Sequence, residues 1–197
     1  MPTYLTKITT PKSVTRDIHR THKILTTAVC PPNITTPGRV ATRLLHRVER
    51  GGREILAQSA TPLDPTRLEG GCVIAGTKLL DPLLDHLDNG TVVRYKITAN
   101  PVHAPNRVRR PITDPDRILA WWHRTADRIG LVLDSTALLD TAKTSGMRRD
   151  QRVVVQTATM EGVATIRDVD TVRDAIVLGV GHARAYGCGL LSVVPLE

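Results

Sequence analysis

The sequence predicts an α+β protein in which the order strand, helix, strand, strand, helix, strand occurs twice. Short stretches of alternating apolar and polar residues indicate strands, and segments with capping signals between them indicate helices. A proline-containing segment, 101–106, separates two halves of similar size. The chain has 197 residues, enough for two domains of usual size. We therefore expect two tandem ferredoxin-like (βαββαβ) domains, residues 1–101 and 107–197.

The N-terminal half contains the clearest early turn signals. Ser13 is a plausible helix N-cap, and the Cys-Pro-Pro sequence that begins at Cys30 stops the helix. Gly51 and Gly52 separate two strand-like stretches, which predicts a hairpin. Residues 62–90 are more ambiguous. The elements expected in this half are a strand at 4–9, a helix at 13–29, a hairpin formed by 40–50 and 53–60, a short helix at 78–87 and a strand at 91–101.

The C-terminal half contains a well-marked helix. Asp114 is its expected cap, Pro115 occupies the first helical position, and Gly130 follows the end. Residues 140–150 are polar and basic, so we expect them to connect two strands. The elements expected in this half are a strand at 107–112, a helix at 114–130, strands at 131–139 and 151–166, a helix at 168–179 and a final strand at 189–196.

The chain is strongly basic. It has 27 Lys and Arg against 19 Asp and Glu, for a net charge of +8 and an isoelectric point near 9.9. That balance favours a polyanionic partner, nucleic acid first and an anionic membrane surface second, with a basic surface that binds nothing as the alternative. Aromatic residues make up 3% and Phe is absent, so recognition through phosphates and shape is favoured over base stacking.

The cysteine pattern indicates neither a disulfide framework nor a metal site, the hydropathy indicates no membrane span, and no cofactor is expected. Cys30, Cys72 and Cys188 are far apart and form no CxxC pair. No apolar run approaches the roughly 18 residues of a membrane helix, and the N-terminus lacks an apolar signal segment. We therefore expect a cytoplasmic protein with reduced cysteines.

Four glycines lie close together before the last strand, at 179, 181, 187 and 189. A dinucleotide-binding fingerprint places its glycines between a strand and a following helix, whereas here they follow a helix. A helix C-cap and a tight turn are one interpretation. A loop that packs against the other domain or against a nucleic acid backbone is the other, and it also accounts for His182 and Arg184 between the glycine pairs.

The helix near the N-terminus carries His19 and His22 three residues apart, so both lie on neighbouring parts of one face. At 100° per residue, His22 lies roughly 50° and His19 roughly 110° from the centre of the apolar stripe. Histidine suits proton transfer near neutral pH. A solvated face is the alternative, and a metal pair is disfavoured because helical zinc histidines prefer a spacing of four.

Three stretches carry a family resemblance: "RDIHRTHK" (16–23), "YKITANPV" (95–102) and "GVGHARAYGCGLLSVVPL" (179–196). The chain resembles the CasE (Cse3) family, the CRISPR repeat-processing endoribonucleases of type I-E systems, in order along essentially its whole length. The resemblance implies a tandem ferredoxin-like fold and metal-independent cleavage of CRISPR repeat RNA (pre-crRNA) at the 3′ base of its stem-loop. It also implies products with a 2′,3′-cyclic phosphate and a 5′-hydroxyl, and retention on the mature crRNA as a Cascade subunit.

The resemblance also implies site residues. His22 aligns with the family's active-site histidine, whereas His19 is a departure, since relatives often carry tyrosine there. His19 is expected to carry a proton or to orient the phosphate. His46, His86, His103 and His123 are expected at the surface. The residues expected to bind RNA are Arg16, Arg20 and Lys23 on the helix, Arg107, Arg109 and Arg110 after the linker, Lys143, Arg148, Arg149 and Arg152 in the basic connection, and Gly181, His182, Arg184, Gly187 and Gly189 in the glycine block.

The expected partners are CRISPR repeat RNA, crRNA and other Cascade subunits, with no membrane, and the free protein is expected to be monomeric. Two alternatives remain at this stage. One is a non-catalytic subunit that binds an RNA hairpin. The other is a general basic nucleic-acid-binding protein.

Overall fold

The computed structural model describes residues 2–30, 41–104 and 108–196. The chain forms two compact units. Unit 1 comprises Met1–Leu83, Thr144–Val155 and Arg184–Gly187, and unit 2 comprises Leu84–Lys143, Gln156–Ala183 and Cys188–Glu197.

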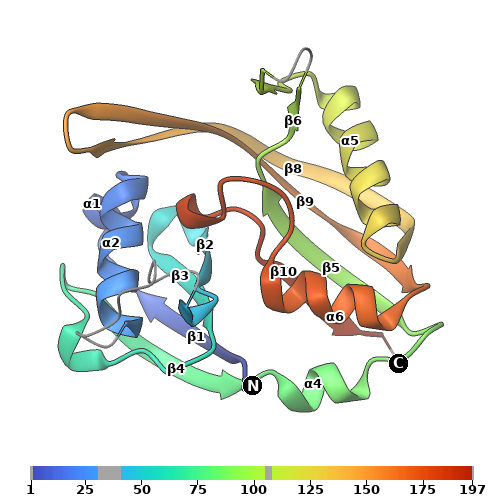
Figure 1. Cartoon of the computed structure of the whole chain (residues 1–197), viewed down its shortest axis with the longest axis horizontal. Helices are drawn as coiled ribbons and strands as arrows, with labels where there is room; N and C mark the ends of the chain where they lie inside the picture. The colour runs from blue at the N-terminus through green and yellow to red at the C-terminus, as the bar shows by residue number, and fades with distance from the viewer. Residues whose placement is uncertain (1, 31–40, 105–107, 197) are drawn as a thin grey trace. The chain divides into compact units, whose positions relative to one another are not determined.

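Unit 1 is built on a four-stranded antiparallel sheet with the order β2-β3-β1-β4 (Figure 1). The connection between β3 and β4, residues 60–72, holds the short 3-10 turn η2. The elements of the unit are β1 (Tyr4–Thr9), α1 (Lys12–Thr15), α2 (Ile18–Val29), β2 (Leu45–Glu49), the 3-10 turn η1 (Arg50–Gly52), β3 (Glu54–Ser59), the 3-10 turn η2 (Pro65–Arg67) and β4 (Val73–Leu79).

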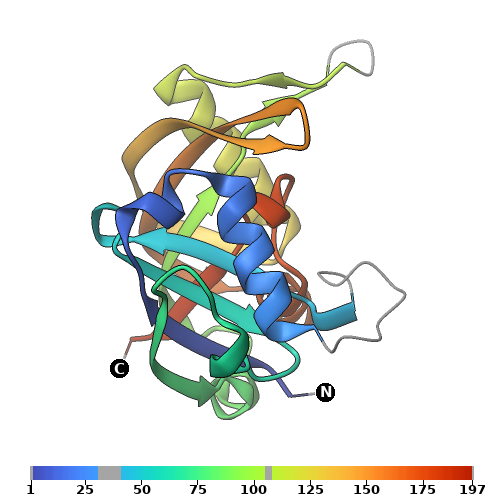
Figure 2. The ribbon, with the colours of Figure 1, turned by 90° about the vertical axis from the view of Figure 1, so that its left-hand side faces the viewer.

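Helix α2 lies across one face of this sheet (Figure 2). Its apolar side, including Leu25 and Val29, packs with Ile8, Ile55 and Ala57 of the strands into a common buried cluster. Each of the fully buried Leu, Ile and Val side chains contributes roughly 1.5–3 kcal/mol. This packing fixes the rotation of α2, so its remaining residues face away from the sheet.

The expected helix at 13–29 is two helices. Asp17 separates α1 from α2 because its backbone is extended, with φ −110° and ψ 110°, and its side chain caps α2. An N-cap residue needs a non-helical backbone while its carboxylate accepts backbone N–H groups. The helix therefore begins at Ile18, after the position that Ser13 was expected to cap.

The stretch around Leu80 also differs from the prediction. Residues 78–87 were expected to be helical, but β4 continues to Leu79 and only α4 (Asp81–His86) is helix.

The strand expected at 91–101 as the last of the first domain is β5 (Val92–Ala99), which pairs with β9 and β10 of the second sheet. Sequence periodicity identifies a strand, but pairing across the sheet decides which strands it joins.

Unit 2 contains the second four-stranded sheet, with the order β10-β5-β9-β8. The strand expected at 107–112 does not enter this sheet: Arg110–Pro111 (β7) pairs with Val102–His103 (β6) in a separate short ladder. The other elements are α5 (Pro115–Arg128), β8 (Leu131–Arg148), β9 (Gln151–Ile166), α6 (Val169–Leu178), the 3-10 turn η4 (Arg184–Tyr186) and β10 (Leu191–Pro195).

The basic stretch at 140–150 was expected to be a connection and is mostly strand. Strand β8 runs to Arg148, and the turn to β9 is made at Arg149 and Asp150, with Arg149 at φ 53°. The result is a long hairpin whose last part, Thr144–Val155, belongs to unit 1. We call Thr144–Val155 the hairpin tip.

The fold class is confirmed. Each sheet places its first strand between its third and fourth, which is the ferredoxin-like strand order. In unit 2 the core includes Trp122, whose indole N–H donates to the hydroxyl oxygen of Tyr95 at 3.1 Å. A buried Trp of this kind needs a partner for its N–H.

Candidate active site

Helix α2 presents His19 and His22 on the side that the sheet does not cover. Both side chains are partly exposed, whereas Ile18, Thr21 and Leu25 between and beyond them are buried. His22 Nδ1 lies 3.4 Å from Thr26 Oγ1, one turn further along the helix. The expected pair of imidazoles therefore lies at the edge between the core and solvent.

The turn η4 packs against α2 and β2 within unit 1. The ring of Tyr186 meets the ring of His22 edge to face, with centroids 6.2 Å apart and an interplanar angle of 70°. Edge-to-face pairs of this kind hold a ring in one orientation. Tyr186 is thus a candidate functional residue that sequence analysis did not single out, although it lies in the glycine block that carried the family resemblance.

Gly187 explains part of that glycine block. Its φ is +85°, a conformation that favours glycine. A Cβ added at this position would lie 3.5 Å from His46 Nε2, so the loop passes directly over the His46 ring.

His46 is buried, contrary to the expectation that it lies at the surface. It is 2% exposed, and it pairs with Ala57 in the β2–β3 ladder. Opposite residues in an antiparallel ladder project to the same face, and Ala57 belongs to the cluster beneath α2. Leu44, two positions before His46 and part of the same buried cluster, was the signal that could have indicated burial, because alternate residues of an extended chain project to the same side.

Burial keeps His46 uncharged. It lowers the pKa of His46 from its ordinary 6.5 to about 3, and the nearby charge of His22 acts in the same direction. Among the described residues, Nδ1 of His46 has no hydrogen-bond partner. His103 is partly exposed, and His86 and His123 are exposed as predicted.

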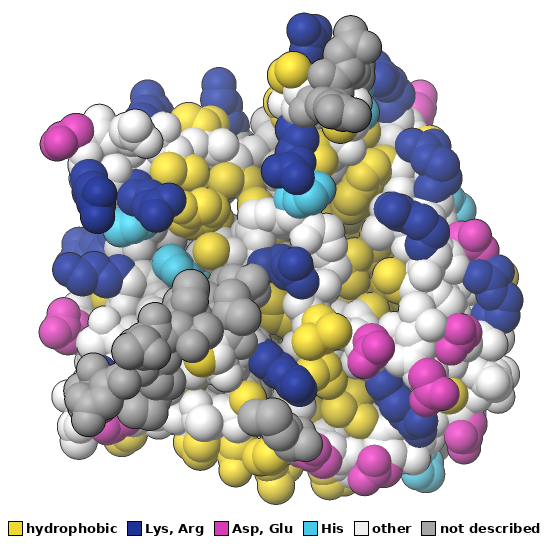
Figure 3. Space-filling model, in the orientation of Figure 1, with side chains coloured by type: hydrophobic (Ala, Val, Ile, Leu, Met, Phe, Trp, Pro, Cys, Tyr) yellow, Lys and Arg dark blue, Asp and Glu magenta, His cyan; other side chains and the backbone are white. Residues whose placement is uncertain are grey.

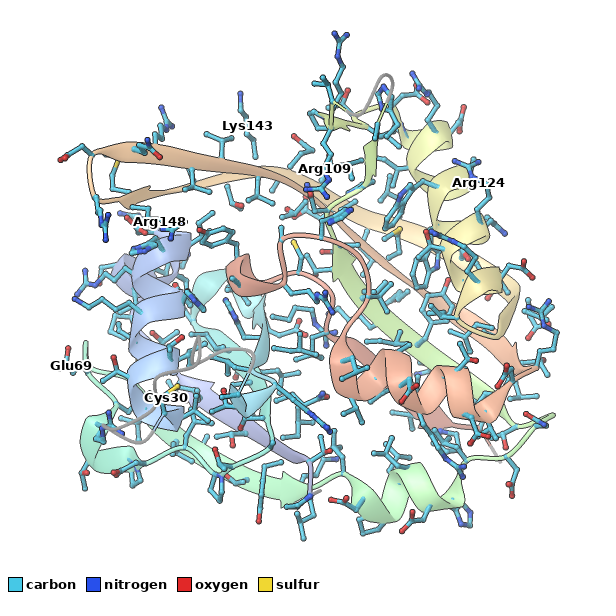
Figure 4. All side chains as sticks on the ribbon, viewed as in Figure 1. Cys30, Glu69, Arg109, Arg124, Lys143 and Arg148 are labelled. Carbon is cyan, nitrogen blue, oxygen red and sulfur yellow. The ribbon has the colours of Figure 1, made fainter. Side chains whose placement is uncertain are left out.

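Exposed cationic side chains surround the histidines in unit 1. Arg16 lies in the link between α1 and α2, and Arg20 and Lys23 lie on α2. The hairpin tip adds a second basic group, consisting of Arg148, Arg149 and Arg152, all exposed. Figure 3 shows Lys and Arg side chains gathered over the hairpin tip and the adjoining part of α2, with histidine beside them. Figure 4 shows Arg148 near the N-terminal end of α2. Such a surface attracts phosphates.

The remaining predicted residues have varied surroundings. Arg107 lies outside the described residues. Arg109 and Lys143 are exposed in unit 2 (Figure 4). Arg110, Gly181 and His182 of the same unit are also exposed. Arg184 is partly exposed in η4.

Gly189 does not fit the expected RNA-binding role. It is buried, its N–H donates to the carbonyl of Thr98 at 2.7 Å, and its own carbonyl accepts from Val180 N at 2.9 Å. Because its backbone groups are already paired, Gly189 serves the fold of unit 2.

Over residues 2–30, 41–104 and 108–196, no group of three His, Cys, Asp or Glu side chains is placed to share a metal ion. No helix within those ranges has the length and apolar character to cross a membrane.

The unit 1 site thus joins two imidazoles, a phenol and six exposed cations around one helix. Imidazoles take up and release protons near neutral pH, and the cations can hold phosphates. The arrangement suits proton transfer beside a bound polyanion.

Comparison with known proteins identifies the family. The family model described as "CRISPR associated protein" matches residues 3–195. The chain is 27% identical to the CRISPR system Cascade subunit CasE of Escherichia coli (strain K12), with 98% of this chain and all of that protein covered. It superposes on Thermus thermophilus Cse3 bound to an RNA representing a pre-cleavage complex, with a TM-score of 0.84 at 24% identity, over 99% of this chain and 100% of that one.

A further similar structure comes from a CRISPR RNA-guided surveillance complex. It is 29% identical, with a TM-score of 0.73, over 98% of this chain and 100% of that one. Because the family model matches almost the entire length and the CasE subunit of E. coli is similar over its whole length, the chain belongs to the CRISPR associated protein family, in its CasE (Cse3) branch.

Proposed function

We propose that this protein is an endoribonuclease that cleaves CRISPR repeat RNA at the 3′ base of its stem-loop and then remains on the mature crRNA as a Cascade subunit. The observation that carries the proposal is the partly exposed His22, set against Tyr186 and flanked by two basic groups. The similar E. coli protein is a Cascade subunit, and the similar T. thermophilus protein binds RNA. Because the substrate is a transcript, we propose a cytoplasmic location.

The reaction we propose uses the RNA's own 2′-hydroxyl as the nucleophile. Its oxygen attacks the adjacent phosphorus, and the bond from phosphorus to the 5′ oxygen of the next nucleotide breaks. The products are a 2′,3′-cyclic phosphate and a 5′-hydroxyl. One group must remove the 2′-hydroxyl proton and another must protonate the departing oxygen, which requires no metal ion.

His22 performs one of these two proton transfers. His19, three residues earlier on the same face, is placed for the other transfer or for orienting the phosphate. Tyr186 holds the His22 ring at its edge, which limits the orientations of that imidazole.

The basic groups hold the stem-loop through its backbone. A-form RNA is recognised mainly by shape and phosphate contacts, which matches many exposed arginines and few aromatics. The RNA-binding residues in this proposal are Arg16, Arg20, Lys23, Arg148, Arg149, Arg152, Arg184 and Gly187 of unit 1, with Arg109, Arg110, Lys143, Gly181 and His182 of unit 2.

The test is single-turnover cleavage of labelled repeat RNA in EDTA. We expect a product that ends in a 2′,3′-cyclic phosphate, and no product when the nucleotide before the scissile bond lacks its 2′-hydroxyl. The His22→Ala variant is expected to lose on the order of 10²- to 10⁴-fold in rate if it performs one proton transfer.

The matched control is His86→Ala, because His86 is exposed on α4 and is expected to leave the rate unchanged. Tight binding of the repeat hairpin without any cleavage would instead indicate the non-catalytic RNA-binding subunit. Unchanged cleavage by His22→Ala would remove the assignment of His22.

A further inference from the structure

The start of helix α2 is joined to the hairpin tip through the side chain of Asp17. Oδ1 of Asp17 accepts hydrogen bonds from the backbone N–H groups of His19 and Arg20, both at 2.8 Å. Oδ2 accepts from the backbone N–H of Met147 at 3.2 Å. One carboxylate therefore serves the first turn of the helix and a residue 130 positions away in the chain.

The strand of the hairpin tip also approaches the helix backbone directly. Asp17 and Ser145 form a parallel bridge, and Gly146 is buried against the helix start. A Cβ added to Gly146 would overlap Asp17 Oδ1 and lie 2.7 Å from His19 N. Gly146 does not have a positive φ, so the need for glycine here is lack of space and not backbone conformation.

The contact favours an ionised Asp17. Burial alone would raise the pKa of Asp17, but the backbone N–H groups of Arg20, Met147 and His19, together with the charge of His19, outweigh it and lower the pKa. Hydrogen bonds to a carboxylate are stronger than neutral ones, and a negative charge at a helix N-terminus is favourable.

We infer that four residues, Asp17, Ser145, Gly146 and Met147, form a clasp between helix α2 and the hairpin tip. This clasp positions the catalytic histidines relative to the arginines of the tip. His19 is bonded to Asp17 through its backbone, and Arg148 and Arg149 follow Met147 directly. Phosphates held by these arginines are thereby placed with respect to the helix that carries His19 and His22. The chemical consequence rests on the proposed function, whereas the contact itself does not.

A simple capping role for Asp17 is the competing explanation, and Asp17→Asn separates the two. Asparagine is as good an N-cap as aspartate, so its amide oxygen keeps the bonds from His19 and Arg20. Its NH₂ group then faces the N–H of Met147, and two donors cannot bond. The variant therefore opens the clasp and leaves the cap.

Two matched controls are available. Asp114→Asn makes the same change at the N-cap of α5, where the carboxylate accepts from Arg117 N. Gly76→Ala adds a methyl group to a strand glycine with no described heavy atom within 4 Å of the new Cβ. Neither residue belongs to the clasp or to the proposed RNA-binding groups.

The first experiment is amide hydrogen exchange of the RNA-free protein by NMR. We expect the Met147 amide to be protected in the wild type and to exchange about tenfold faster or more in Asp17→Asn and Gly146→Ala, the effect of losing one hydrogen bond to a charged group. Asp114→Asn and Gly76→Ala are expected to leave it unchanged. An unprotected Met147 amide in the wild type would overturn the clasp, whether or not the protein cleaves RNA.

The second experiment is single-turnover cleavage at saturating protein. Asp17→Asn and Gly146→Ala are each expected to lower the rate constant by about tenfold. Because both substitutions break the same contact, the double variant is expected to cleave no more slowly than the slower of the two single variants. Independent effects that multiply, or unchanged rates in both variants, would show that the clasp does not position the histidines. If the wild type itself cleaves nothing, the proposed function fails, while hydrogen exchange still decides the contact.

Discussion

His22 and His46 are both histidines of unit 1, yet their surroundings give them different states. His22 is partly exposed and stacks edge to face on Tyr186, so it can exchange protons with a substrate. His46 is 2% exposed, behind Gly187, and burial keeps it neutral. A neutral ring at this position avoids a second positive charge next to His22. In the proposed function His22 therefore contributes chemically, whereas His46 contributes by packing.

The buried state of His46 predicts a pH-dependent stability. Its pKa is about 3 in the folded protein and about 6.5 when unfolded. Between these values the unfolded chain binds the additional proton, so the free energy of unfolding is undiminished above pH 6.5 and falls as pH drops towards 3. At pH 5 the loss from His46 is about 2 kcal/mol.

Denaturant unfolding at pH 8 and pH 5 measures this loss. The wild type is expected to lose about 2 kcal/mol more than His46→Leu does between the two pH values. Leu45→Val is the control: Leu45 is buried beside His46, and its change introduces no titrating group, so it lowers stability equally at both. Identical pH dependence in the wild type and His46→Leu would mean that His46 is not held neutral.

At the scale of elements, the β8–β9 hairpin carries a basic group at its tip. Strand β8 is 18 residues long, well above the usual strand length of about 5–6 residues. The tip bears Arg148, Arg149 and Arg152, all exposed. An extended hairpin can present these cations together to an RNA backbone.

The hairpin tip predicts a salt-dependent contribution to RNA binding. A double variant, Arg148→Ala with Arg149→Ala, is expected to weaken binding of a non-cleavable repeat hairpin. It should also reduce the slope of log K against log salt by about 2, roughly one for each lost phosphate contact. Titrations at several salt concentrations measure the slope.

Arg124→Ala serves as the control for charge alone. Arg124 is exposed on α5 in unit 2 (Figure 4) and lies outside the proposed binding groups. We expect it to leave the slope unchanged. An equal reduction by Arg124→Ala would mean that the net charge of the protein, and not the hairpin tip, determines the affinity.

At the scale of the whole molecule, the chain contributes to unit 1 in three separate segments, Met1–Leu83, Thr144–Val155 and Arg184–Gly187. The last two are short and are flanked on both sides by residues of unit 2. Loss of structure in unit 2 would therefore release two segments that complete unit 1, including Tyr186 and the hairpin tip. We expect the two units to unfold together.

Cysteine alkylation tests this expectation. Cys72 is buried in unit 1 and Cys188 in unit 2, and burial raises the pKa of Cys188 to about 12. The thiolate is the reactive form, so Cys188 is expected to resist iodoacetamide at pH 8 until unfolding exposes it. Mass spectrometry across a denaturant series should show Cys72 and Cys188 becoming reactive at the same midpoint. Two separate midpoints would show independent units.

Sequence patterns determined the elements with strong local signals. Asp114, Pro115 and Gly130 bracket α5 as predicted because capping and proline geometry are local properties. Alternation of apolar residues located β1 and β10. Helical spacing placed His19 and His22 on neighbouring parts of one face, and the family resemblance singled out His22.

Contacts between residues far apart in the chain determine strand pairing and burial, which local sequence patterns do not predict. The partners of β5, the burial of His46 beneath the loop at Gly187, and the bond from Asp17 to Met147 each join residues far apart in the chain. Hydrophobic alternation tells which residues of a strand face a core, but not which strand lies beside it. By itself, therefore, the sequence determined two ferredoxin-like units and a basic helix with two histidines. Only the tertiary structure placed Tyr186, His46 and the hairpin tip around that helix, because cross-strand pairing and close packing depend on residues that the local sequence does not contain.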